Sequence, residues 1–271
     1  MVDMEKITSR DNQHLVNARK VRDGRSPELI FVEGRRLVTE ALRSDISIDQ
    51  CFCVDDFGDR ELISAISEKT TRIFVIPERI FGSIADTSSP QGIILLAKRP
   101  DSGVGRIERL LADRSTGFPL VLFLNEINNP ANLGAILRTA EAAGVAGVVI
   151  SENSADAYSP KSLRSAMGSG FRLPIWENVQ FSEVLKWANK WGLKLTAADI
   201  GAERIYSEVD WRQPRLLIFG SEAHGLSESD LGRVEELLHI PMENNVESLN
   251  LAVSAGIILF EAKRQRSGTG T

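Results

Sequence analysis

The sequence is poor in the side chains that bind metals and form disulfides. Its 271 residues include two cysteines and three histidines. Cys51 and Cys53 are too few for a disulfide framework or a four-ligand metal site. His14, His224 and His239 are scattered, with no HExxH pattern and no acidic partner at ligand spacing. The Cys-x-Cys spacing instead predicts two buried thiols on one face of a strand, so we expect no metal centre.

Long apolar runs are also missing. The longest ones, 118–124 and 255–260, fall far short of the roughly 18 residues that a membrane-spanning helix needs. Residues 1–15 are polar and charged, without the apolar stretch of a secretory signal. Hydrophobic residues make up 42% and charged residues 25% of the chain, an ordinary globular mixture. These features favour a cytoplasmic protein of one large or two medium domains.

The glycine motifs of common nucleotide enzymes and serine hydrolases are absent. The chain has no GxxxxGK[ST] phosphate-binding loop, no GxGxxG and no GxSxG. The GVG at 103–105 lacks the third glycine and the downstream acidic residue of a dinucleotide-binding turn, so we interpret it as linker. A conventional dinucleotide-dependent oxidoreductase and a serine hydrolase are therefore disfavoured.

Positive charge is scarce overall but is gathered in islands. The net charge of −5 argues against nonspecific binding of polyanions by the whole surface. Such an island is usually a solvated face, but several of them on an acidic chain keep a local nucleic-acid surface open. The islands are Arg19, Lys20, Arg22 and Arg25; Lys161, Arg164 and Arg172; and Lys263, Arg264 and Arg266.

Apolar strands alternate with amphipathic helices in both halves of the chain. In residues 1–100 we expect strands at 29–34, 50–55, 72–77 and 92–98, with helices at 35–44 and 60–69. This alternation predicts a largely parallel sheet covered by helices. Residues 101–117 are expected to be a linker. A second α/β domain follows over 118–271, with strands at 119–127, 145–151, 193–199 and 215–222.

The first unusual segment is 125–145, NEINNPANLGAILRTAEAAGV. Asn129 before Pro130 is typical of a helix start and Gly144 of a helix end, which predicts a helix over 130–143. Gly134 and Arg138 share one face of that helix. A glycine inside a helix costs about 1 kcal/mol relative to alanine. Either Gly134 clears space for a ligand that Arg138 contacts, or it allows close helix packing beside a surface arginine.

Two further segments place glycine and polar residues beside apolar elements. In 216–227 a strand runs into Gly220 and Glu222, at the place where open α/β sheets bind ligands. Glu222 could act as a base, but bracing the tight turn is the favoured role. In 240–266 a helix capped by Ser248 or a neighbour is apolar nearly all round, as in a buried helix or a subunit interface. Asn250 in its first turn indicates contact with a ligand or partner.

Together these segments resemble the three signature motifs of the SpoU (TrmH-type) RNA ribose methyltransferases, in order and at ordinary spacing. The matching patterns are NxGxxxR at Asn132, Gly134 and Arg138, the GSExxGL turn, and IPM followed by SLN. Residues 159–174 resemble the family's SPK…GS…FRxP segment. The first hundred residues resemble its substrate-binding domain, which is related to ribosomal proteins.

The resemblance implies a C-terminal α/β domain with a deep trefoil knot, preceded by a smaller α/β RNA-binding domain. It implies S-adenosylmethionine as the cofactor, held mainly by backbone groups at Gly220, Ile240 and Leu249, with Ala198 as a weaker fourth contact. The RNA-binding residues are expected in the basic islands, at Arg19, Lys20, Arg22, Arg25, Lys161 and Arg164. A homodimer formed through the C-terminal domain is also expected, with no metal and no membrane.

The implied reaction is methyl transfer to a ribose 2′-hydroxyl of structured RNA. In the family Arg138 is given the role of base, but a guanidinium is poorly suited to lose a proton. A role in clamping phosphate and stabilising the alkoxide therefore stays open beside it. Ser248 and Asn250 would orient the ribose, Asn132 would position Arg138, and Glu222 would brace the loop. Large-subunit ribosomal RNA is the favoured substrate. The alternatives are transfer RNA, or a non-catalytic ribosome assembly factor that retains the knot.

Overall fold

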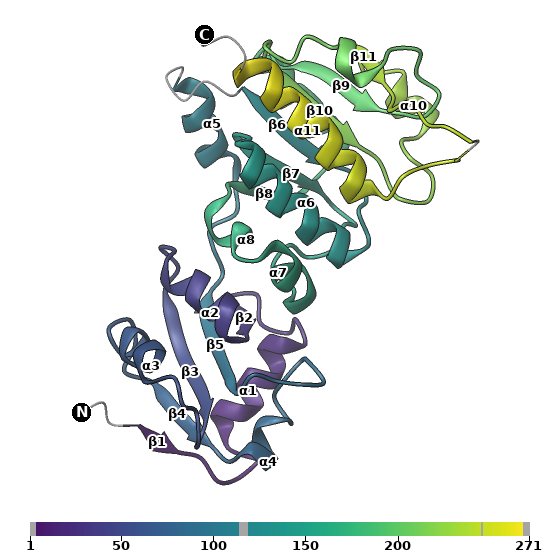
Figure 1. Cartoon of the computed structure of the whole chain (residues 1–271). Coiled ribbons are helices and arrows are strands. Elements are labelled where there is room, and N and C mark those ends of the chain that lie inside the picture. Colours follow the sequence, from purple (N-terminus) through teal and green to yellow (C-terminus); the bar gives the residue numbers. More distant parts are fainter. Residues whose placement is uncertain (1–3, 114–118, 245, 268–271) are drawn as a thin grey trace. The chain divides into compact units, whose positions relative to one another are not determined.

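The computed structural model describes residues 4–113, 119–244 and 246–267 (Figure 1). Its internal contacts divide the chain into two compact units. Unit 1 contains the residues up to Asp101 together with Asp156–Arg172. Unit 2 contains Ser102–Ala155 and the residues from Leu173 onward. Each unit is built on its own sheet, and the predicted α/β class is confirmed.

Unit 1 has a five-stranded sheet in the order β1-β4-β3-β5-β2. Its strands are β1 Glu5–Lys6, β2 Leu29–Glu33, β3 Ile48–Val54, β4 Ile73–Ile76 and β5 Ile93–Lys98. The expected sheet was largely parallel, but β5 lies between β2 and β3 and is antiparallel to both. Periodicity identifies a buried strand without showing its neighbours, and the last strand of this unit inserts between two earlier ones.

The helices of unit 1 are fixed by local capping and by burial. They are α1 Gln13–Arg22, α2 Arg35–Leu42, α3 Arg60–Ser67 and the single-turn α4 Glu78–Phe81. The side chains of Asn12 and Asp59 cap α1 and α3 by accepting backbone N–H groups. The predicted buried thiol pair is confirmed, because Cys51 and Cys53 are both buried in β3. Burial raises the pKa of the Cys53 thiol to about 11, so it stays protonated.

A segment from the middle of the chain also belongs to unit 1. It holds α7 Pro160–Ala166 and α8 Ser169–Arg172. Arg164 pairs with Asp86 at 2.6 Å and Arg172 pairs with Glu40 at 2.8 Å. Helix α7 contacts β2 of unit 1, and Tyr158, Leu163 and Phe171 of this segment are buried. The contacts therefore divide the chain differently from the expected boundaries of 1–100 and 118–271.

Unit 2 has a six-stranded sheet in the order β11-β9-β10-β6-β7-β8, and every pairing in it is parallel. Its strands are β6 Leu120–Leu124, β7 Gly147–Ser151, β8 Ile175–Val179, β9 Lys194–Ala198, β10 Arg215–Phe219 and β11 Glu236–Leu238. Strands β6, β7 and β10 are buried along their whole length, as expected for a parallel sheet that helices cover on both faces.

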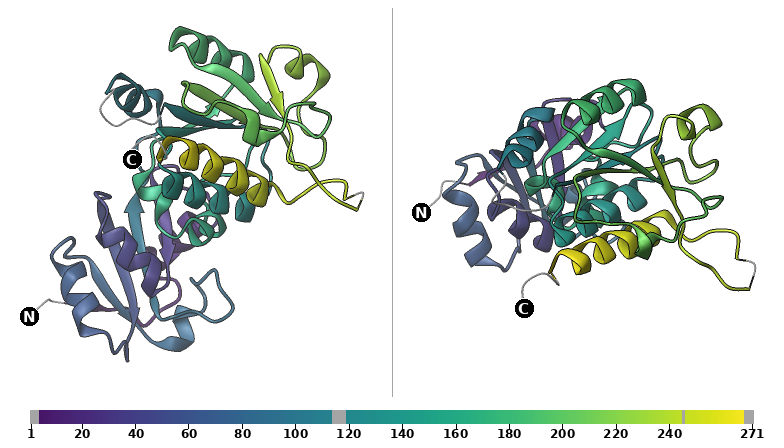
Figure 2. Two further views of the ribbon diagram at one scale, coloured as in Figure 1. Left: turned by 45° about the horizontal axis from the view of Figure 1, so that its top comes forward. Right: turned by 90° about the horizontal axis from the view of Figure 1, so that it is seen from above.

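The helices of unit 2 are α5 Val104–Ala112, α6 Pro130–Ala143, α9 Phe181–Lys190, the single-turn α10 Glu228–Leu231 and α11 Leu251–Ser267, with a short 3-10 turn at Tyr206–Glu208. Helices α6 and α11 lie side by side (Figures 1 and 2). Helices α5 and α9 pack against another part of the sheet, in one apolar cluster with Val121 and Phe123 of β6. None of the described helices is both long and apolar enough to cross a bilayer.

The expected linker is largely a helix. Its residue Ile107 in α5 is fully buried in the core of unit 2. Glu108 of the same helix accepts hydrogen bonds from the indole N–H groups of Trp187 and Trp191, each at 3.0 Å. The glycines and polar residues around α5 suggested a linker, but its apolar stripe packs on the sheet. Residues 114–117 of the expected linker lie outside the described part of the chain.

Candidate active site

The carboxyl edge of the unit 2 sheet brings three of the four predicted cofactor contacts together. Ala198 ends β9, Gly220 follows β10 directly, and Ile240 follows β11 by two residues. These strands are neighbours in the order β11-β9-β10 and run parallel, so their carboxyl ends share one edge. Leu249, the fourth, lies directly before α11.

The turn after β10 has room only for glycine. A Cβ atom added to Gly220 would lie 2.2 Å from the carbonyl carbon of Gly225. Ser221 and Gly225 exchange backbone hydrogen bonds of 3.0 and 3.1 Å, and Gly225 has a left-handed φ of 65°. The backbone therefore doubles back tightly at the strand end.

A chain of hydrogen bonds joins all three sequence motifs. The side-chain amide of Asn132 in α6 donates to Glu222 at 3.3 Å, and its carbonyl oxygen accepts from Asn250 at 3.1 Å. Glu222 also accepts from the backbone N–H of Asn128 at 3.4 Å. Three polar side chains that lie far apart in the sequence are thus fixed beside each other. Asn128 is the member of this group that the motif patterns did not indicate.

Asn250 has a structural reason for its position as well. Its side-chain oxygen Oδ1 accepts hydrogen bonds from the backbone N–H groups of Ala252 at 2.9 Å and Val253 at 3.4 Å, so Asn250 is the residue that caps α11. Ser248, the other candidate for the cap, lies two residues earlier and is exposed. The polar residue at the start of this apolar helix is therefore explained by capping together with its bond to Asn132.

Helix α6 presents Arg138 to solvent one turn after Gly134. The helix forms over the predicted residues, with the Asn129 side chain accepting from Ala131 N–H at 2.9 Å and Gly144 in the left-handed conformation at φ 84°. Gly134 is buried and Arg138 is exposed. The guanidinium is thus available to a ligand, on the same helix as Asn132.

The predicted RNA-binding residues differ in their exposure. Lys20, Arg25 and Lys161 are exposed. The others make contacts within unit 1. Arg19 donates to the Arg10 carbonyl, Arg22 donates to the Ser83 and Ala85 carbonyls, and Arg164 pairs with Asp86.

The site suits a cofactor that backbone groups hold. The tight turn at Gly220, Ala198 and Ile240 lie at the same carboxyl edge of the sheet. Within the described ranges, no group of three or more His, Cys, Asp and Glu side chains is arranged to hold a metal ion. In open parallel α/β sheets ligands bind at the carboxyl ends of the strands, so this edge is where unit 2 would hold a cofactor.

The chain belongs to the SpoU rRNA methylase family. The model of that family matches residues 119–260, and a model described as RNA 2'-O ribose methyltransferase substrate binding matches residues 31–102. The 23S rRNA (guanosine(2553)-2'-O)-methyltransferase of Bacillus subtilis is 30% identical over 265 residues, which cover 96% of this chain and all of that protein.

Solved structures agree with this family over almost the whole chain. An RNA 2'-O ribose methyltransferase has a TM-score of 0.80 and 29% identity, covering 97% of this chain and 99% of its own. The SpoU methyltransferase AviRb of Streptomyces viridochromogenes, solved with S-adenosylmethionine, has a TM-score of 0.82 and 26% identity, covering 94% of this chain and 98% of its own. The protein is an RNA methyltransferase, and S-adenosylmethionine is its cofactor.

Proposed function

We propose that the protein methylates a ribose 2′-hydroxyl in large-subunit ribosomal RNA. The hydrogen-bonded group of Asn132, Glu222 and Asn250 carries the proposal, because it unites the three motifs, and the exposed Arg138 lies on the same helix as Asn132. The substrate follows from the Bacillus subtilis relative, whose name specifies 23S rRNA. A catalytically silent assembly factor would not need this group of polar side chains at the edge of the cofactor site.

Mapping of 2′-O-methyl positions tests the substrate. RNA from cells with and without the gene is compared, with complementation by the wild-type protein and by an Arg138→Ala variant. One position in large-subunit RNA should lose its methyl group and regain it with the wild type alone. Loss confined to transfer RNA would select that alternative, and no loss in any RNA would contradict the proposed activity.

The side chains around α6 supply positioning and charge stabilisation. Bound S-adenosylmethionine would supply an electrophilic methyl group; its transfer to the ribose 2′-oxygen would break the bond between sulfur and methyl carbon and release S-adenosylhomocysteine. Arg138 holds the neighbouring phosphate and stabilises the negative charge that develops on that oxygen. Asn132 keeps Arg138 oriented, Ser248 and Asn250 contact the ribose, and Glu222 braces the turn after β10. A guanidinium is poorly suited to lose a proton, so Arg138 is better suited to stabilise the alkoxide than to act as base, and the ribose proton passes to solvent.

We also propose the trefoil knot that the family resemblance implies. Support comes from the path of the chain after β9. Asp199 continues the pairing of β9 with β11, and Arg204 and Tyr206 then bond to His239 just beyond the end of β11. The chain between them thus passes around the end of a strand, as a knotted crossing requires.

Self-association through α11 is the remaining part of the proposal. Val253 and Phe260 of this helix are each about half exposed, at 51% and 49%, although both are large and apolar. A second copy that packs against this surface would bury them. Sedimentation of the purified protein should show a dimer, and charged substitutions at both positions should shift it towards the monomer. A location in the cytoplasm and independence of metal ions stay predictions.

A further inference from the structure

The segment 199–206, here called the collar, passes around the end of β11. On one side, Asp199 N–H donates to the Leu238 carbonyl at 2.9 Å, which extends the pairing of β9 with β11. Farther along, His239 N–H donates to the Arg204 carbonyl and Tyr206 N–H donates to the His239 carbonyl, both at 2.9 Å. The collar begins directly after Ala198 and is bonded to the residue before Ile240. It therefore connects two of the proposed cofactor contacts.

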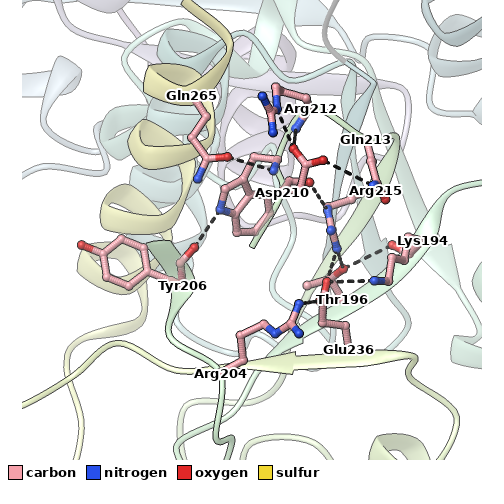
Figure 3. Close-up of polar contacts among 11 residues, drawn as sticks. Lys194, Thr196, Arg204, Tyr206, Asp210, Arg212, Gln213, Arg215, Glu236 and Gln265 are labelled. Carbon is pink, nitrogen blue, oxygen red and sulfur yellow. Dashed lines mark hydrogen bonds and ion pairs between the residues drawn. The ribbon is translucent and has the colours of Figure 1, made fainter. Parts of the chain in front are cut away.

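Arg204 of the collar is bonded to β11 and to the residue that follows it. Its carbonyl oxygen accepts from His239 N–H and also lies 3.1 Å from Nδ1 of the same histidine. Its guanidinium donates to Oε1 of Glu236 in β11 at 2.5 Å (Figure 3). The side chain of Arg204 is 52% exposed, whereas that of Glu236 is only 7% exposed. One exposed arginine thus ties the collar to β11 through both its backbone and its side chain.

Glu236 has cationic partners other than Arg204. Its Oε2 pairs with Arg215, whose side chain is 2% exposed, and lies 3.4 Å from Lys194 (Figure 3). Arg215 also donates to Thr196 Oγ1 at 2.7 Å. Burial acts to raise the pKa of Glu236, but the bond to Arg215 and the nearby charges of Arg215 and Lys194 outweigh it, so the pKa is lowered. Arg215 therefore balances the charge of Glu236 without Arg204. The ion pair between Arg204 and Glu236 instead attaches the collar to β11.

We propose that Arg204 is a positioning residue for S-adenosylmethionine. Arg204 holds the collar against β11, so that Ala198 and Ile240 present their backbone groups at the spacing that the cofactor requires. This inference rests on the proposed placement of the cofactor at the carboxyl edge of β9, β10 and β11. Loss of the side chain should loosen the collar and weaken binding of the cofactor. The reacting groups on α6 and α11 should stay in place.

The Arg204→Ala variant tests this role in the full chain. Isothermal calorimetry should show S-adenosylmethionine and S-adenosylhomocysteine binding about tenfold more weakly, which corresponds to about 1.4 kcal/mol. The kcat at saturating cofactor should stay within about twofold of the wild type, with the loss confined to KM. Arg204→Lys keeps a cation near Glu236 and should recover part of the affinity.

Arg212→Ala is the matched control. Arg212 is also an exposed arginine of unit 2, with a side chain 61% exposed, and it pairs with Asp210 at 2.7 Å (Figure 3). Because that pair does not join the collar to β11, the control should bind the cofactor like the wild type. Hydrogen exchange without cofactor gives a second readout. The amides of His239 and Tyr206 should exchange faster in Arg204→Ala and be unchanged in Arg212→Ala.

Three outcomes would overturn the inference: wild-type affinity in a folded Arg204→Ala variant, an equal loss in Arg212→Ala, or a loss in kcat with affinity unchanged. A wild-type protein that bound no S-adenosylmethionine would overturn the proposed cofactor site and the inference with it, whereas wild-type affinity in Arg204→Ala would overturn the role of Arg204 alone.

Discussion

Gly220 is the residue at which the geometry of the cofactor edge is strictest. An added Cβ would meet three backbone atoms of Gly225 and Leu226 at 2.2 to 2.5 Å. The clashing atoms belong to a turn that two reciprocal hydrogen bonds close, so they cannot move aside as a flexible side chain would. The glycine is therefore required by packing of the backbone against itself, whatever the ligand.

Gly220→Ala should force this turn open and displace the strand end that faces the cofactor. We expect a cost in stability of about 1–3 kcal/mol, as for other overpacked sites, and at least a tenfold loss in affinity for S-adenosylmethionine, or about 1.4 kcal/mol. Thermal denaturation and calorimetry would measure the two effects. Gly105→Ala is the control, because a Cβ there meets nothing within 4 Å. Unchanged cofactor affinity in Gly220→Ala would show that the turn does not shape the site.

Arg138 should contribute mainly in the transition state. Arg138→Ala should reduce methyl transfer at least about a hundredfold, the scale of losing one positioned catalytic group. Affinity for S-adenosylmethionine should change little, because Arg138 lies on α6 while the proposed cofactor contacts lie on other elements. Single-turnover methylation and calorimetry separate these effects. Arg138→Lys keeps the charge but loses the planar fork and should fall in between. Near-normal turnover in a folded alanine variant would make Arg138 a structural residue.

The bounds of a helix or strand were predictable where the residues at its ends mark them in the sequence. The cap residues Asn129 and Gly144 mark both ends of α6 in the sequence, and the structure places them there. The order of strands was not predictable, because the insertion of β5 between β2 and β3 depends on long-range packing. The motif residues indicated the edge of the site. The motifs did not indicate the ion pairs that support this edge. Arg215 and Glu236, charged residues at the first positions of β10 and β11, were the only signals of the buried ion pair.

The two roles of Asn250 at the start of α11 can be separated. Asn250→Asp keeps the carbonyl-like oxygen that caps the helix but loses the amide that donates to Asn132. Asn250→Ala loses both. Thermal denaturation should show the alanine variant about 1 kcal/mol less stable and the aspartate variant close to the wild type. Turnover should fall in both variants. An active aspartate variant would mean that Asn250 acts in capping alone.

For the whole molecule, the assignment of α7 and α8 to unit 1 changes how the chain can be divided. Residues 102–271 on their own would lack β2, which α7 contacts in unit 1. This fragment would also lack Asp86 and Glu40, the ion-pair partners of Arg164 and Arg172. A cut between residues 101 and 102 therefore does not follow a natural boundary.

Limited trypsin digestion would show this dependence. In a fragment of residues 102–271, we expect rapid cleavage after Lys161, Arg164 and Arg172, because the segment that carries them loses its packing partner. The full chain should resist cleavage at Arg164 and Arg172 under the same conditions. Equal resistance of the fragment and the full chain would show that α7 and α8 fold stably with unit 2 alone.

The hydrogen bonds that Asn132 donates to Glu222 and accepts from Asn250 also bear on when the protein becomes active. Their partners lie 90 and 118 residues later in the chain than Asn132. During synthesis, α6 and the strands beside it emerge long before either partner exists. The growing chain therefore adds 112 residues, from Arg138 to Asn250, before this neighbourhood is complete. Methyl transfer becomes available in one late step, when α11 docks beside α6, and no earlier fragment should act on RNA.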